Sequence, residues 1–148
     1  MYFKKNIVLK VIFLFSIFGA FINASELEIA ARIIDKTVAS LFPNKKSVKT
    51  WANSEYHIKL ISKSKKMSLA GFTEKASFYL VGSSIDTYIP KNTIIFATDI
   101  DLFYNDERVI GAFYWQKGRP NLIFLKERLD KYKLSLSEEF SSYIEETL

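Results

Sequence analysis

The chain contains no cysteine and only one histidine among 148 residues. The absence of cysteine excludes disulfide bonds, thiolate metal sites and a cysteine nucleophile. The sequence also lacks the glycine spacing of dinucleotide-binding or Walker phosphate loops. We therefore expect no cofactor, and carboxylates and binding surfaces are the remaining candidates for function.

The first 24 residues have the order of a secretory signal peptide. Three lysines and no acid open the chain, residues 11–22 are uncharged and mostly apolar, and Ala24 supplies a small residue for cleavage. An uncleaved anchor is the alternative. As a helix, however, the fourteen residues between Lys10 and Ser25 would span about 21 Å, which is short of a membrane core of about 30 Å. We predict cleavage after Ala24, a periplasmic domain of residues 25–148, and no stable membrane insertion of that domain.

Cleavage would also change the charge of the protein. It would remove three of the 21 Lys and Arg residues and none of the 16 acids, so the net charge would fall from +5 to +2. The remaining basic runs, residues 45–46 and 63–66, are short and are not interleaved with aromatic residues. A nucleic-acid partner is therefore not expected.

Hydrophobic periodicity predicts an α/β fold for the exported part. We expect a single domain with a mixed sheet of about five strands, helices on its faces and an antiparallel hairpin near the C-terminus. The predicted elements are a helix over 26–42, a loop over 44–54, a strand over 55–61, a short helical stretch around 67–72, central strands at 78–81 and 94–97, a hairpin of 109–115 with 121–125 joined by a loop over 116–120, a helix over 126–133 and a last helix around 136–144. Ser135 and Glu138 have the spacing of a capping box for the last helix.

Polar residues follow the two central strands. Open α/β sheets place ligands at this edge, so Ser83, Ser84, Asp99 and Asp101 are candidate ligand-binding residues. The two aspartates could hold a hard cation or act as acid and base. The alternative, which we favour, is that Asp99 caps a helix beginning at Ile100. We expect each central strand to lead into a helix.

The single histidine, His57, falls on the polar side of the predicted strand 55–61. No serine is marked as a nucleophile beside it. A surface histidine without a catalytic role is the favoured interpretation.

The predicted hairpin holds the most distinctive stretch, GAFYWQKGRPNLIF. Strand alternation places Phe113 and Trp115 on one face and Tyr114 on the other. Aromatic residues with arginine are typical of interface anchors, so Tyr114, Trp115, Lys117 and Arg119 are candidate partner-binding residues. Helices covering both faces of the hairpin are the alternative.

Three segments together resemble the YfiR-like periplasmic family: SFYLVGS (77–83), TIIFATD (93–99) and VIGAFYWQKGRPNLIFLKERLDKYKLSL (109–136). The resemblance implies a non-enzymatic protein that binds the periplasmic part of an inner-membrane diguanylate cyclase and represses it. This chain departs from the family in a shortened middle region, about fifteen residues between Ile61 and Phe78, and in its lack of cysteines. No family residue with a chemical role maps onto a position here.

Three functions stay open at this point. The first is a periplasmic regulator of a membrane signalling protein, the second a periplasmic small-ligand-binding protein, and the third a metal-dependent hydrolase built on Asp99 and Asp101. Whether the protein is a monomer or a homodimer is also open.

Overall fold

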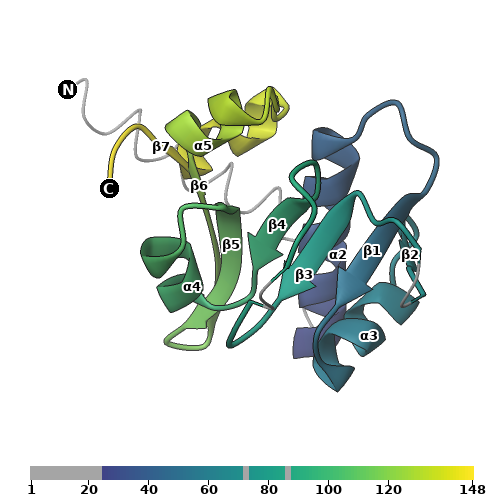
Figure 1. Cartoon of the computed structure of the whole chain (residues 1–148). Coiled ribbons are helices and arrows are strands. Elements are labelled where there is room, and N and C mark those ends of the chain that lie inside the picture. Colours follow the sequence, from purple (N-terminus) through teal and green to yellow (C-terminus); the bar gives the residue numbers. More distant parts are fainter. Residues whose placement is uncertain (1–24, 72–73, 86–87) are drawn as a thin grey trace.

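The computed structural model describes residues 25–71, 74–85 and 88–148 (Figure 1). The predicted signal peptide, residues 1–24, lies outside the described residues. The elements are α2 (Glu26–Leu41), β1 (Val48–Ala52), α3 (Glu55–Ser62), β2 (Met67–Leu69), β3 (Phe78–Val81), β4 (Ile94–Ala97), α4 (Ile100–Asn105), β5 (Val109–Gln116), β6 (Arg119–Leu125), α5 (Lys126–Lys131), a 3-10 helix η1 (Glu138–Tyr143) and β7 (Ile144–Glu145). None of the helices in this described part is long and apolar enough to cross a membrane.

The predicted α/β class with a mixed sheet is confirmed. The sheet has seven strands in the order β2-β1-β3-β4-β5-β6-β7, two more than expected. The five strands from β2 to β5 run parallel, β5 and β6 form the predicted antiparallel hairpin, and β7 pairs parallel with β6.

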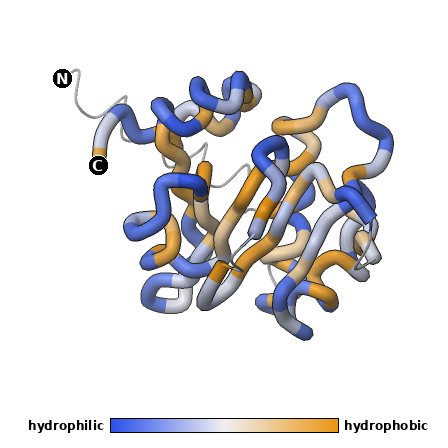
Figure 2. The backbone as a smooth tube through the Cα atoms, viewed as in Figure 1, coloured by the Kyte–Doolittle hydropathy of each residue, from blue (hydrophilic) through white to orange (hydrophobic). Residues whose placement is uncertain are grey.

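Two hydrophobic clusters lie on opposite faces of the sheet. The larger joins α2, α3 and the C-terminal elements to one face, and the smaller joins α4 to the other. β3 and β4 are buried at every position, as expected for strands covered on both faces. Figure 2 shows the hydrophobic residues concentrated along these central strands, with hydrophilic residues in the surrounding loops.

The first helix and the hairpin follow from their sequence patterns. Ser25 caps α2 by accepting a hydrogen bond from the backbone N–H of Glu28, and the apolar positions of this helix at helical spacing are buried. The hairpin has the predicted pairing, but its turn is tighter than the expected loop over 116–120. Lys117 and Gly118, with φ of 50° and 72°, form a two-residue turn between Gln116 and Arg119. Positive φ at both turn residues is the condition for a turn whose twist matches the strands.

The region between α2 and β3 was predicted wrongly. Residues 48–52, expected to be loop, form β1, and residues 55–61, expected to be a strand, belong to helix α3. His57, Leu60 and Ile61 are the buried positions of α3, and their spacing of three and four residues is helical. Ser54 supplies the cap, because its hydroxyl accepts a hydrogen bond from the His57 backbone N–H at 3.2 Å.

Three further expectations are corrected. Met67–Leu69 is the edge strand β2 rather than a helical stretch. No helix occurs in the described parts of the link from β3 to β4, residues 82–85 and 88–93, so only β4 leads into a helix as expected. The last helix is the 3-10 segment η1, which begins after Ser137 and not at a capping box of Ser135 and Glu138. The Ser137 backbone N–H instead donates to the Ser40 hydroxyl at 2.7 Å, which ties this segment to α2.

Candidate functional site at the carboxyl edge of the sheet

The two groups of predicted site residues lie along the same edge of the sheet. Ser83 and Ser84 follow β3, Asp99 and Asp101 follow β4, and Lys117 follows β5. Because these three strands are parallel, their carboxyl ends meet at one edge (Figure 1). The candidate ligand residues and the candidate partner residues therefore share one surface, which we call the carboxyl edge.

A buried histidine organises the middle of the carboxyl edge. His57 is 1% exposed and not on the surface as predicted. Its Nε2 lies 2.7 Å from the Thr98 hydroxyl, and its Nδ1 lies 2.8 Å from the Ser54 hydroxyl and 3.1 Å from the Asn53 side-chain oxygen. The imidazole thus joins the end of β4 to the start of α3.

Burial lowers the pKa of His57 from 6.5 to about 4. The ring is therefore neutral at pH 7 and both of its nitrogens already have partners. A general base needs a nitrogen within reach of a substrate proton. His57 is instead a structural group, and sequence reasoning missed its network because it assigned the segment to a strand.

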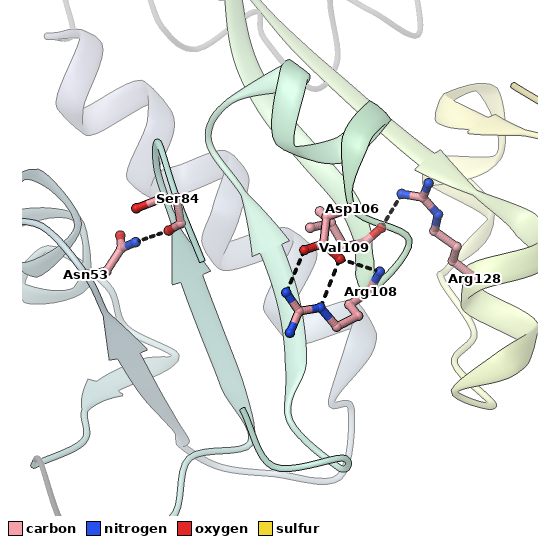
Figure 3. A network of polar contacts seen from close by, with 6 residues as sticks. All are labelled: Asn53, Ser84, Asp106, Arg108, Val109 and Arg128. Carbon is pink, nitrogen blue, oxygen red and sulfur yellow. Dashed lines mark hydrogen bonds and ion pairs between the residues drawn. The ribbon is translucent and has the colours of Figure 1, made fainter. Parts of the chain in front are cut away.

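Asn53 extends this network to the end of β3. Its side-chain oxygen accepts a hydrogen bond from the backbone N–H of Gly82 at 3.2 Å, and its amide nitrogen donates to the Ser84 carbonyl at 2.6 Å (Figure 3). The order β2-β1-β3-β4-β5 has its topological switch point between β1 and β3, where open α/β sheets bind ligands. Here the hydrogen bonds of the Asn53 side chain span that position. Ser83 and Ser84 are exposed beside it.

The aspartates after β4 have the capping geometry that we favoured. The Asp99 carboxylate accepts a hydrogen bond from the Asp101 backbone N–H at 2.8 Å, and α4 begins at Ile100. Asp101 lies in the first turn of α4, where negative charge is favoured. The described residues contain no cluster of three or more His, Asp or Glu side chains that could hold a metal ion.

The hairpin divides the candidate partner residues between the two faces of the sheet. Phe113 and Trp115 share the face of the larger cluster, with ring centroids 5.7 Å apart, and Tyr114 packs on the other face, as the alternation predicted. Arg119 pairs with Gln116 in the register, so it lies on the Tyr114 face. Tyr114 and Trp115 are both half-buried. Their exposure lies between that of exposed interface anchors and that of residues covered by helices on both faces, the two alternatives for the hairpin.

The cations at the tip of the hairpin are exposed to solvent. In the described part of the chain, neither Lys117 nor Arg119 makes an ion pair. Their charges are therefore available to a partner.

Two exposed tyrosines that sequence reasoning missed extend the aromatic surface around the hairpin. Tyr56, on α3, is 42% exposed. Burial raises its pKa, whereas a hydrogen bond with the Trp115 side chain lowers it, so Tyr56 lies against the hairpin. Tyr104, on α4, is 53% exposed. The pKa of Tyr114 is raised chiefly by burial and to a smaller extent by the nearby Tyr104, which places the two side chains close together. Only the tertiary packing of α3 and α4 brings these tyrosines to the hairpin, so no sequence signal marked them.

Comparison with protein-family models, with curated proteins and with solved structures found no match to this chain.

Proposed function

We propose that this protein is an exported, non-enzymatic regulator that binds a membrane signalling protein through the hairpin end of the carboxyl edge and represses it. The observation that carries the proposal is the position of two exposed cations, Lys117 and Arg119, next to the half-buried Tyr114 and Trp115. Neither cation makes an ion pair with any residue that the structure describes. Aromatic side chains with arginine are enriched at protein interfaces, and isolated cations at a turn steer association without adding to stability.

The partner class and the compartment come from sequence. The order of the first 24 residues supports export to the periplasm, and the YfiR-like resemblance supports an inner-membrane diguanylate cyclase as the partner. Regulation rather than catalysis is supported by the single histidine, whose two ring nitrogens are both occupied.

The test is affinity capture from solubilised membranes with a double charge reversal at the hairpin. Lys117→Glu with Arg119→Glu should change the stability by on the order of 0.5 kcal/mol or less, because both side chains are exposed. Capture of the signalling protein should nevertheless be lost, since the reversed charges would face the partner.

A matched control is Lys63→Glu with Lys65→Glu, which reverses two exposed charges between α3 and β2, at the other end of the strands. This control should keep the partner. If both double variants capture it as well as the wild type, the hairpin is not the contact surface and the proposal rests on resemblance alone.

A second candidate function is small-ligand binding at the switch point between β1 and β3. The sheet order and the exposed Ser83 and Ser84 favour it, whereas the hydrogen bonds of Asn53 across this position count against it. A periplasmic ligand that raises the melting temperature should lose this effect in Ser84→Trp, which would block the position. An unchanged rise would exclude this position as the binding site.

A further inference from the structure

A cavity of about 350 Å³ lies at the opposite edge of the sheet from the hairpin turn. Three segments that are far apart in sequence line it: the approach to β4, the residue before β5 and the end of α5. Ile95, which is 2% exposed, and Thr93, which is 4% exposed, belong to its buried lining. The volume lies within the range of small-molecule sites.

The charged side chains that line this cavity are all cations. They are Lys91, Arg108 and Lys131, and no acidic residue is among the lining residues. Lys91 and Lys131 are exposed, and within the described ranges neither forms an ion pair. These two lysines give the lining of the cavity its net positive charge.

Arg108 is held in a fixed position beside them. Its Nε donates to Asp106 Oδ1 at 3.0 Å and its second terminal nitrogen donates to Asp106 Oδ2 at 2.7 Å (Figure 3). This bidentate pair orients the guanidinium plane and neutralises most of its charge. The side chain then contributes part of the wall, while the lysines contribute the net charge.

The rest of the lining is mainly apolar or aromatic. Ile89, Pro90 and Ile95 supply aliphatic surface, and the Tyr132 ring lies 5.8 Å from the Lys131 ammonium. A bare inorganic ion would leave this surface without a partner. A ligand that combines an anionic group with an apolar body would satisfy both parts of the cavity.

We propose that this cavity binds a small organic anion with an apolar or aromatic body, its acidic group paired with Lys91 and Lys131 and its body packed against Ile89, Pro90 and Ile95. The site is separate from the hairpin surface and does not depend on the proposed regulatory partner. The cavity proposal can therefore fail while the proposed function holds, and the proposed function can fail while the cavity proposal holds.

The experiment uses two fluorescent probes of similar size on the purified protein. The anionic probe is 8-anilinonaphthalene-1-sulfonate and the neutral one is N-phenyl-1-naphthylamine. Wild type should bind the anion saturably and more tightly than the neutral probe. Lys91→Gln with Lys131→Gln should weaken binding of the anion by about tenfold or more, as expected for the loss of two charged contacts, and leave binding of the neutral probe unchanged.

The matched control is Lys63→Gln with Lys65→Gln, which removes the same charge between α3 and β2, outside both the cavity and the hairpin surface, and should leave binding of both probes unchanged. Melting temperatures equal to that of wild type exclude partial unfolding as the cause of a change in fluorescence. The proposal is overturned if the anion does not bind saturably, if wild type binds both probes equally well, or if the two double variants weaken binding of the anion to the same extent.

Discussion

Acidification from pH 7 to pH 5 should destabilise this protein chiefly through His57. The imidazole is buried at the carboxyl edge, where Thr98, Ser54 and Asn53 surround its two nitrogens with neutral oxygens. No carboxylate is among these partners, so the network supplies no negative charge to offset the cost of burying a protonated ring. Since the chain has no other histidine, no second side chain of this type titrates in the same pH range.

The magnitude follows from the shifted pKa. Burial lowers the pKa of His57 from 6.5 to about 4 in the folded protein, whereas the unfolded chain keeps a value near 6.5. Above pH 6.5 both states are neutral and the full stability is present. As the pH falls from 6.5 towards 4, the unfolded state gains a proton that the folded state does not, and stability is lost. Between pH 7 and pH 5 this loss amounts to about 2 kcal/mol.

Urea unfolding at pH 7 and at pH 5, on wild type and on His57→Gln, measures the effect. Glutamine can still hydrogen-bond but does not titrate, so every other pH-dependent contribution cancels between the two proteins. The advantage of wild type over His57→Gln should shrink by about 2 kcal/mol between the two pH values. An advantage that is equal at both pH values would show that the buried, neutral state of His57 is wrong.

Three other substitutions test the packing and the caps. Gly111→Ala would bring a Cβ within 2.4 Å of Phe124 Cδ1 and 2.6 Å of the Ile123 carbonyl oxygen, so urea unfolding should show a loss of about 1 to 3 kcal/mol in the free energy of unfolding. An unchanged unfolding midpoint would contradict this close contact. Arg128→Met removes the buried guanidinium that donates to the carbonyls of Phe103 and Val109 at 2.6 and 2.7 Å. Calorimetry should show a loss of about 2 to 4 kcal/mol in the free energy of unfolding, whereas a loss below about 0.5 kcal/mol would mean that these hydrogen bonds contribute little. Asp99→Asn should keep the melting temperature and partner capture, because asparagine caps a helix as well as aspartate does, whereas Asp99→Ala should lower the free energy of unfolding by about 1 kcal/mol. Loss of capture in Asp99→Asn at an unchanged melting temperature would indicate a ligand or metal role for Asp99 instead.

The parts of the fold that could be predicted from sequence are those in which pattern and environment agree. The apolar runs 78–81 and 94–97 are central strands because both of their faces are covered, and the apolar stripe of residues 26–41 is a helix that packs on one face. Alternation in the hairpin correctly separated Trp115 from Tyr114.

The segment around His57 failed because two periodicities compete in it. Tyr56, Ile58 and Leu60 alternate as in a strand, but Tyr56 and Ile58 are 42% and 44% exposed, and the residues that are buried follow the helical period. Ser54 caps this segment as a helix, and a serine at this position is a helix-start signal that favours the helical period over the alternating one. The strand β1 was missed because its apolar residues are few, and its place in the sheet depends on pairing with β2 and β3.

The candidate site could be predicted only in part. The residues after β3 and after β4 were expected at one ligand-binding edge, but the hairpin residues were identified separately. Their place at the same edge depends on β5 running parallel to β4, which no local pattern contains. The cavity at the opposite edge was not predicted at all, because its cations come from three distant segments.

The most direct test of the proposed function is photo-crosslinking from single positions on the two edges of the sheet. A benzophenone amino acid in place of Lys117 would lie at the hairpin turn, and the same residue in place of Lys46, which is exposed just before β1, would lie at the opposite edge. In intact cells, irradiation should give a covalent adduct with an inner-membrane signalling protein from position 117 and none from position 46. No adduct from position 117, or equal adducts from both positions, would contradict binding through the carboxyl edge.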